Sequence, residues 1–281
     1  YGTWIIREIE SPKGYVLSEE EIAVTIGKVD EVVEIELVNY FIKGNIALTK
    51  VDEDYPDNKL SGAVFEVYSD TNGDGKLDKD DTLLGEMKEL DGGVYQMSEL
   101  RFGKYLVKET KAPTGFVLDE NVYSVSVEEN GKTYTVENKA GVGFINAAQK
   151  GSLKIVKTSS DGKVEGFSFR VTGVDYDQTF KTDKNGEIVI EGLRIGDYTV
   201  SEVSDKASAG YILPADKQAT VKVDATAIVQ MHNEFRDTPK TGDDFNLGLW
   251  VSLAALSVVG AGVLGSVSYT HLRAHETGRN L

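Results

Sequence analysis

Three residue types with chemical potential, lysine, glutamate and asparagine, recur at matching places along this 281-residue chain. A lysine lies six residues after a glycine in GNIALTK, which ends at Lys50, and again in GSLKIVK, which ends at Lys157. A lysine amine is nucleophilic only when neutral, and burial in an apolar core lowers its pKa toward that form. Burial also raises the pKa of a carboxyl group, so that a protonated glutamate can donate a hydrogen bond.

The glutamates and asparagines follow patterns of their own. A glutamate precedes a Gly-aromatic-x-Leu run in REIESPKGYVL, KETKAPTGFVL and SEVSDKASAGYIL. An asparagine stands five residues before the next repeat's glycine in NYFIKG and NAAQKG, and another ends the last strand-like run. The repeated positions are Lys50, Glu109 and Asn146, then Lys157, Glu202 and Asn233, and, in the first segment, Glu8 and Asn39.

The segments that must position these residues are expected to be strands. Short β-branched and aromatic runs separated by Gly, Asn and Asp turns dominate residues 1–235, which is typical of an all-β sandwich or barrel. Because strand side chains alternate between faces, Ile46 and Leu48 share a face with Lys50, and the glutamates and asparagines likewise end apolar stripes. A single polar residue could escape to solvent at a strand end. An unpaired buried charge is costly. The same residue types at matching places in the repeats therefore indicate that these side chains are buried because they have a role there.

Internal repetition also divides the chain. Residues 1–42 correspond to the C-terminal part of a truncated repeat, 43–149 to a complete repeat with an acidic loop, and 150–236 to a second complete repeat. We interpret the N-terminus as a truncation, because the chain starts inside a strand-like run without a signal peptide. The first segment lacks the strands it needs, and we expect it to be poorly ordered or to pair wrongly.

The run YLVKETKAPTGF resembles the glutamate motif of the B-type, SpaA-like repeats of Gram-positive collagen adhesins and sortase-assembled pilins. This resemblance extends over nearly everything up to Arg236. It implies tandem prealbumin-like, or inverse-immunoglobulin, β-sandwiches. In many such repeats a first-strand lysine and a last-strand asparagine form an autocatalytic isopeptide bond, promoted by a middle-strand glutamate. The implied triads are Lys50, Glu109 and Asn146; Lys157, Glu202 and Asn233; and Glu8 and Asn39 with an upstream lysine.

The implied chemistry is a single event in each domain. A neutral amine attacks the asparagine carbonyl, which a protonated glutamate polarises, and ammonia leaves. This is maturation rather than turnover, so we do not expect an enzyme. In the chain-entropy model, closing a loop of most of a domain stabilises it by about 4–5 kcal/mol.

An acidic loop at residues 70–81, DTNGDGKLDKDD, follows a calcium-loop template. The expected ligands are Asp70, Asn72, Asp74, the Lys76 carbonyl, Asp78 and Asp81, with Gly75 at the sharp turn. The last position holds aspartate instead of a bidentate glutamate, and the flanks read as strands rather than helices. A solvated hairpin turn is the alternative. The third repeat lacks this loop, so calcium is not required for the fold, and no other cofactor is expected.

The C-terminal region resembles a wall-sorting signal. Pro239, Thr241 and Gly242 within TPKTG match the LPXTG pattern that sortase cleaves between threonine and glycine, although Thr238 replaces the usual leucine. After the 237–244 motif and linker, the uncharged stretch 245–267 would span about 35 Å as a helix, enough to cross a bilayer. A buried core helix is the alternative, but all-β repeats offer it no packing site. Residues 268–281 resemble translated sequencing-adapter read-through, and we interpret them as an artefactual tail.

Composition limits the partners. The formal charge of −16 repels phosphate backbones, and the absence of cysteine excludes disulfides and thiol chemistry. We expect an exported cell-wall stalk of an adhesin or pilin, held transiently in the membrane. Its expected partners are a sortase, peptidoglycan or another pilin subunit, and a host matrix or surface ligand, without nucleic acid. One alternative is a stalk that displays an upstream enzymatic domain. Another is a polymerising backbone pilin, whose donor-lysine motif this chain lacks.

Overall fold

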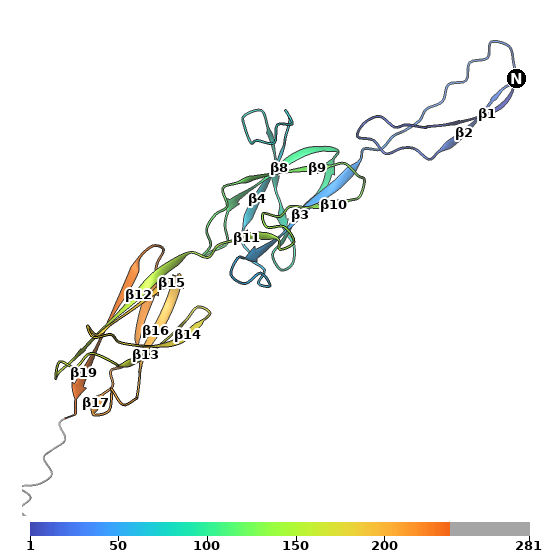
Figure 1. The fold of residues 1–281 in the computed structure, drawn as a ribbon. Coiled ribbons are helices and arrows are strands. Elements are labelled where there is room, and N and C mark those ends of the chain that lie inside the picture. The colour runs from blue at the N-terminus through green and yellow to red at the C-terminus, as the bar shows by residue number, and fades with distance from the viewer. Residues whose placement is uncertain (237–281) are drawn as a thin grey trace, which may run out of the picture.

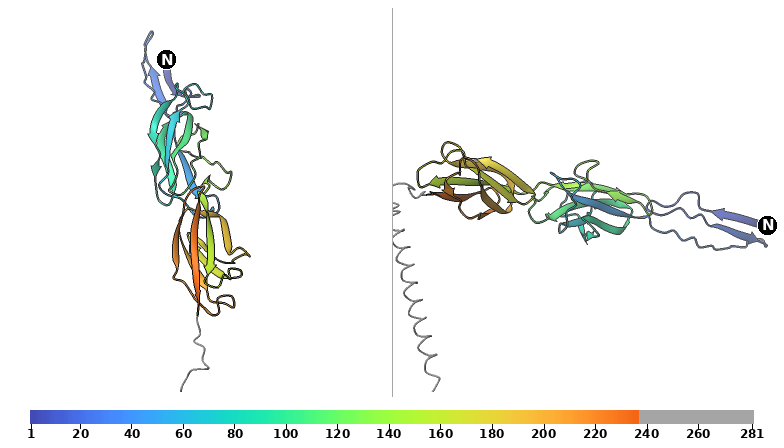
Figure 2. Two further views of the ribbon diagram at one scale, coloured as in Figure 1. Left: turned by 90° about the vertical axis from the view of Figure 1, so that its left-hand side faces the viewer. Right: turned by 90° about the horizontal axis from the view of Figure 1, so that it is seen from below.

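The computed structural model describes residues 1–236, which fold into strands and loops without any α-helix. A hairpin and two β-sandwiches follow one another end to end along an elongated molecule (Figures 1 and 2). The all-β prediction is therefore confirmed. No helix in this part of the chain is long and apolar enough to cross a membrane. The predicted sorting motif and the predicted span at 245–267 lie outside the described residues.

The first segment forms only one hairpin, in which β1 (Gly2–Arg7) pairs antiparallel with β2 (Glu21–Ile26). The expected inward face is exposed: Trp4 is 59% accessible and Ile6 is 37% accessible. Within residues 1–236 no second sheet packs on this hairpin, and Val24, at 7% exposure, is the one apolar side chain of β1 and β2 that is buried. The expectation that this stripe faces a core was wrong for this structure.

The second repeat is a sandwich of two sheets that together contain nine strands. One sheet has the order β10-β3-β7-β6, with β11 also pairing with β3, and the other has the order β5-β4-β8-β9. The bounds of the first sheet are β3 (Lys43–Asp52), β6 (Lys88–Glu89), β7 (Val94–Arg101), β10 (Thr133–Thr135) and β11 (Phe144–Asn146). Those of the second are β4 (Val64–Ser69), β5 (Thr82–Glu86), β8 (Gly103–Lys111) and β9 (Val122–Val127).

The third repeat is built in the same way from two four-stranded sheets, ordered β15-β12-β19-β17 and β14-β13-β16-β18. The first sheet contains β12 (Lys150–Ser159), β15 (Glu187–Arg194), β17 (Tyr211–Ile212) and β19 (Thr226–Phe235). The second contains β13 (Ser168–Gly173), β14 (Tyr176–Lys181), β16 (Gly196–Val203) and β18 (Lys217–Val221).

Each sandwich encloses its own apolar core. In the second repeat the core includes Ile46, Phe65 and Phe144, and no residue of the third repeat belongs to it. The third repeat has a separate core that includes Ile155 and Phe169. Because neither core takes residues from the other repeat, each sandwich contains what it needs to fold by itself.

The first and last strands of each sandwich run parallel, side by side. In the second repeat Phe144 of β11 lies opposite Lys50 of β3, and in the third repeat Met231 of β19 lies opposite Lys157 of β12. The asparagine comes two residues after that partner and therefore faces the same side of the sheet as the lysine. The glutamate-bearing strands, β8 and β16, belong to the opposite sheet. The topology thus directs all three residue types toward the space between the sheets.

Candidate cross-linking sites

The second repeat brings Lys50, Glu109 and Asn146 together in its interior. The side chains of Lys50 and Glu109 are fully buried, and Asn146 is 3% exposed. The Lys50 amine contacts Asn146 Oδ1 and lies 3.3 Å from Glu109 Oε1. Asn146 Nδ2 donates to both Glu109 oxygens, at 3.0 Å and 2.9 Å. Each side chain therefore contacts the other two.

Aromatic rings line the amine side of this site. The Lys50 amine lies 4.6 Å from the centre of the Phe144 ring and 6.0 Å from that of Phe65. Burial lowers the pKa of Lys50 to about 8, although the nearby Glu109 carboxylate opposes the shift. About a tenth of the amine is consequently neutral, and able to attack a carbonyl, at pH 7, far more than for an ordinary lysine.

The position of Glu109 corrects one detail of the expected chemistry. From the sequence we expected the carboxyl group to polarise the Asn146 carbonyl, but it lies against the amide nitrogen instead. It also lies close to the Lys50 amine. From there one carboxyl group can accept a proton from the attacking amine and deliver a proton to the departing nitrogen. This geometry suits a proton shuttle better than an electrophilic hydrogen-bond donor.

The third repeat gathers the matching residues but leaves the lysine turned away. Lys157 and Asn233 are buried, and Asn233 Nδ2 donates to Glu202 Oε1 at 2.7 Å. The Lys157 amine instead donates to the carbonyl of Thr158 at 2.5 Å. Burial lowers the pKa of Lys157 and raises that of Glu202. The lysine is therefore in the same kind of apolar environment as Lys50 but is not engaged with its asparagine.

Two buried oxygen atoms in the third repeat have no hydrogen-bond partner among the described residues, namely Glu202 Oε2 and Asn233 Oδ1. Buried polar atoms rarely stay unpaired, because each costs about 1–3 kcal/mol. The atom equivalent to Asn233 Oδ1 in the second repeat contacts the Lys50 amine. Rotation of the Lys157 side chain toward the asparagine would supply a donor on that side.

The second unpaired atom has a cause in the sequence. In the other two segments, the residue after Gly-aromatic-x-Leu donates its backbone N–H to the glutamate: Asp119 to Glu109 at 2.8 Å and Ser18 to Glu8 at 2.7 Å. In the third repeat the matching residue is Pro214, which has no N–H group. The sequence interpretation missed this proline, although it could have been read from the run GYILP.

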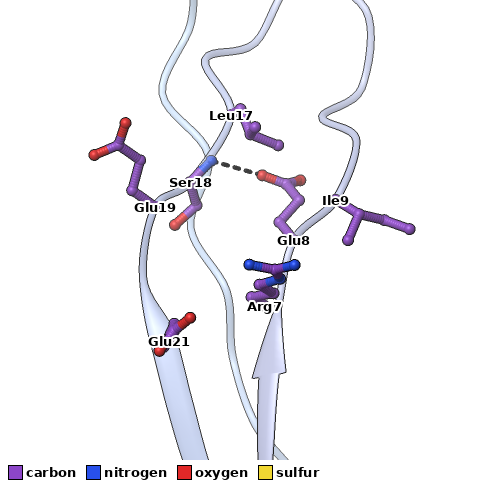
Figure 3. Close-up of a pocket in the computed structure, with 7 residues that line it drawn as sticks. All are labelled: Arg7, Glu8, Ile9, Leu17, Ser18, Glu19 and Glu21. Atoms are coloured by element: carbon purple, nitrogen blue, oxygen red, sulfur yellow. Dashed lines mark hydrogen bonds between the residues drawn. The ribbon is translucent and has the colours of Figure 1, made fainter.

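The first segment contains a glutamate–asparagine pair of the same kind. Asn39 Nδ2 donates to the two Glu8 oxygens at 2.8 Å and 2.7 Å. Figure 3 shows the bond from the Ser18 N–H to the Glu8 carboxylate, which borders a pocket lined by Arg7, Leu17 and Glu21, among others. Both members of the pair are half-buried, and within residues 1–236 no lysine forms an ion pair with Glu8.

The acidic loop at residues 70–81 connects β4 and β5 and is organised by its own backbone. Asp70 accepts N–H bonds from Gly73 and Gly75, and Asp81 accepts from Thr71 and Asp78. The side chains of Asn72, Asp74 and Asp78 accept similar bonds within the loop. Among residues 1–236, no three His, Cys, Asp or Glu side chains converge as a metal-binding group. The calcium site, including the carbonyl of Lys76, therefore stays a prediction from the sequence.

Comparisons with known proteins identify the repeats. The model of the family described as "SpaA: Prealbumin-like fold domain" matches residues 44–140 and 151–235. Among solved structures, the chain is similar to the Bacillus anthracis TIE protein, with 25% identity and a TM-score of 0.64. That similarity covers 84% of this chain but only 42% of the TIE chain. No curated protein matches the chain.

Two pilin structures also resemble the chain, at lower similarity. The minor pilin of Streptococcus agalactiae shows 17% identity and a TM-score of 0.32, over 71% of this chain and 99% of that one. The shaft pilin SpaA from Lactobacillus rhamnosus GG shows 14% identity and a TM-score of 0.31, over 69% and 98%.

The Pro214→Ser variant should reveal the effect of the missing N–H group in the third repeat. Burial raises the pKa of Glu202 above 4.5, so the folded state binds the extra proton and loses stability as the pH rises. A restored donor would stabilise the carboxylate. We expect the variant's advantage in unfolding free energy to grow by about 1–3 kcal/mol between about pH 4 and about pH 7.

Urea denaturation of residues 150–236 across this pH range measures the effect. The Ala215→Ser variant is the control, because it changes a neighbouring exposed residue without adding a backbone donor. A Pro214→Ser difference that is the same at every pH would show that Glu202 is not the group involved.

The predicted calcium site can be tested by thermal unfolding of residues 43–149. A ligand that binds only the folded state at a hundredfold excess over its Kd stabilises by about 2.7 kcal/mol. We expect calcium to raise the Tm of the wild type and of Asp80→Asn, which changes a loop residue outside the ligand pattern. The Asp78→Asn variant should lose the increase. A wild-type Tm that does not respond to calcium would leave the loop as a hairpin turn.

Proposed function

The chain belongs to the SpaA prealbumin-like fold family, and from this premise we propose that it forms the stalk of a Gram-positive cell-surface adhesin or pilin subunit. Successive sandwiches joined end to end provide length without a large single core. The formal charge of −16 suits a molecule that stays soluble and extended outside the cell. In this proposal the residues act once, during maturation, and the chain is not an enzyme.

The observation that best supports the proposal is the buried contact of Lys50 with Asn146 and Glu109. In the proposed reaction, neutral Lys50 Nζ attacks Asn146 Cγ, and a new C–N bond forms. The bond from Cγ to Nδ2 then breaks. Glu109 takes a proton from the amine and transfers one to the leaving nitrogen, which departs as ammonia. The product is a Lys–Asn amide, and the carboxyl group ends in its starting protonation state.

The same reaction is proposed for Lys157 and Asn233, with Glu202 as the shuttle. Here the lysine must first rotate away from the Thr158 carbonyl. That movement exchanges one hydrogen bond for contacts with two buried oxygen atoms that have no partner. The pair of Glu8 and Asn39 would react in the same way with a lysine on a further strand.

The proposed bonds would join the first and last strands of each sandwich. These strands are parallel neighbours, so a pulling force on the ends of a repeat would shear β3 against β11, or β12 against β19. An amide between them places a covalent bond in the path of that force. Without any cysteine in the chain, a disulfide could not perform this role.

Wall attachment is proposed at the TPKTG motif. A sortase would cleave between Thr241 and Gly242 and join the threonine to an amine of peptidoglycan or of another pilin subunit. Residues 245–267 would hold the chain in the membrane until that step. The proposed location is accordingly the cell surface, with a host matrix or surface molecule as the ligand of the complete protein.

The cross-links predict an intact mass for residues 43–236 that is lower than the sequence mass by two molecules of ammonia. The Glu109→Ala variant should lack one of the two losses, and Glu109→Ala combined with Glu202→Ala should lack both. Removal of the shuttle leaves the amine and the amide in place but slows proton transfer, typically by 10²–10⁴-fold. Mass spectrometry of freshly folded protein measures this.

Ammonia can also be lost when an Asn-Gly sequence forms a succinimide, so the linked peptides must be identified. Proteolysis should release a branched peptide that joins Lys50 to Asn146, and a second that joins Lys157 to Asn233. The Lys50→Ala variant is the control, because it removes the nucleophile and leaves every Asn-Gly sequence intact. A wild-type protein with its full sequence mass, and without branched peptides, contradicts the proposed cross-links.

The sorting motif predicts sortase-dependent attachment of an amine to Thr241. The full chain is incubated with Gram-positive sortases and an oligoglycine amine, and the product is identified by mass. We expect the Thr241→Ala variant to remain uncleaved and Thr238→Leu, which restores the usual leucine, to react faster. A wild-type chain that no sortase processes, beside a Thr238→Leu chain that is processed, would show that this motif departs too far from the signal.

A further inference from the structure

The two junctions between successive segments are built from the same backbone contacts. In each, the residue before the next repeat donates its N–H to the carbonyl of the glycine in the Gly-aromatic loop. The carbonyl of that same residue accepts an N–H from the next repeat. The donor is the residue that follows an arginine at the equivalent place in each repeat. The bonds are Ile42 N to Gly14 O, 2.9 Å, and Phe102 N to Ile42 O, 3.0 Å; then Gln149 N to Gly115 O, 2.8 Å, and Ile195 N to Gln149 O, 3.1 Å.

The side chain after each arginine covers the glycine of the preceding segment. A Cβ atom added at Gly14 would lie 3.4 Å from the Phe102 side chain, and one added at Gly115 would lie 4.0 Å from Ile195. These glycines have φ angles of +84° and +86°, where other residues are strained. The glycine loop therefore leaves space into which a side chain from the turn of the next repeat packs.

The arginines, Arg101 and Arg194, occupy the same place in their repeats, immediately before a tight turn between two strands. The guanidinium group of Arg101 lies 3.9 Å from the centre of the Phe41 ring in the first segment. That of Arg194 lies 5.0 Å from the Tyr55 ring of the second repeat. Both arginines thus place their planar head groups against an aromatic ring of the preceding segment.

Arg194 also forms an ion-pair cluster across its junction. Its guanidinium group donates to the two oxygens of Asp52 at 2.7 Å and 2.8 Å, and to Asp54 at 3.0 Å. Lys150 adds a contact of 3.1 Å to Asp54. The side chains of Arg194 and Asp52 are only 15% and 3% exposed. A bidentate pair with so little exposure is directional and is screened weakly by salt.

The protonation of Asp52 fits this arrangement. Burial by itself would raise the pKa of Asp52, but hydrogen bonds from Arg194 and from the backbone N–H of Asp54 outweigh it and hold the pKa below its usual value. The carboxylate is therefore charged at neutral pH and remains paired with the guanidinium group. Loss of either partner would leave a buried charge unpaired, which is strongly destabilising.

We propose that the turn containing Arg194 and Ile195 is a docking element, which fixes the orientation of the third repeat on the second. Its partner is the end of the preceding repeat, formed by Asp52, Asp54 and the glycine loop. Arg101 and Phe102 form the same element at the first junction. This coupling goes beyond the proposed cross-links, because it acts between repeats and requires no covalent bond.

The third repeat has the same glycine loop, but a side chain of the third repeat itself packs against the glycine. Arg236 N donates to the Gly210 carbonyl at 2.7 Å, as at the two junctions. Here the ring of Phe235 covers the glycine, at 3.3 Å from an added Cβ atom. The residue at the matching place is Ala148 before the third repeat and Phe41 before the second. At both junctions the glycine instead contacts the next repeat, through Ile195 and Phe102.

Nuclear magnetic resonance of residues 43–236 tests the docking element, because each sandwich has its own core and can fold without the other. With docking, amide residual dipolar couplings of both repeats fit one alignment tensor, and both repeats share one rotational correlation time. In Arg194→Ala we expect two separate tensors, and correlation times that fall toward those of the isolated repeats. The Asp52→Asn variant should change the couplings in the same direction. The Arg194→Lys variant, whose amine cannot bind bidentately, should retain only part of the shared alignment.

The matched control is Arg170→Ala. Arg170 also makes a bidentate pair, with Asp177 at 2.7 Å and 2.5 Å, but on the exposed surface of the third repeat. It should leave the shared tensor unchanged. Independent tensors in the wild type, or a shared tensor that survives Arg194→Ala, would overturn the docking element. The mass of each sample reports the cross-links separately, so failure of docking and failure of cross-linking give different results.

Discussion

A charged amine cannot remain unpaired in the interior of a β-sandwich, and this constraint shapes both repeats. The second repeat meets it by surrounding Lys50 with a carboxylate, an amide oxygen and two aromatic rings. Parallel pairing of the first and last strands puts the lysine and the asparagine on one face, and the opposite sheet contributes the glutamate. The same contacts that satisfy the buried amine also hold a nucleophile against an amide carbonyl.

The two complete repeats solve this problem differently in detail. In the second, the backbone N–H of Asp119 helps to hold the Glu109 carboxylate. In the third, Pro214 removes that donor, and one oxygen of Glu202 stays unpaired. Burial then dominates the pKa of Glu202, which rises. One residue in a loop therefore removes a hydrogen-bond donor from a site whose three main residues are identical in type.

Between the sandwiches, the important contacts are polar and lie at the surface of each unit. Each core is complete without its neighbour, so the hydrophobic effect stabilises the repeats individually but does not set their relative orientation. Orientation instead depends on a few directional contacts, such as the Arg194 pair with Asp52. Asp52 follows Lys50 by two residues on β3, so the junction is anchored on the strand that bears the buried lysine. An elongated molecule can then transmit orientation from one repeat to the next.

Local pattern was enough to predict the all-β class and to single out Lys50, Glu109 and Asn146 and their counterparts, because alternation along a strand has a short period and the motifs repeat. It could not show where side chains meet across the two sheets. The contact of Glu109 with the amide nitrogen of Asn146 joins two strands of opposite sheets that lie apart in the chain. Arg194 and Asp52 are 142 residues apart, and no periodicity relates them. The exposed face of the first hairpin makes the same point, since a stripe of apolar residues becomes a core only where a second sheet covers it.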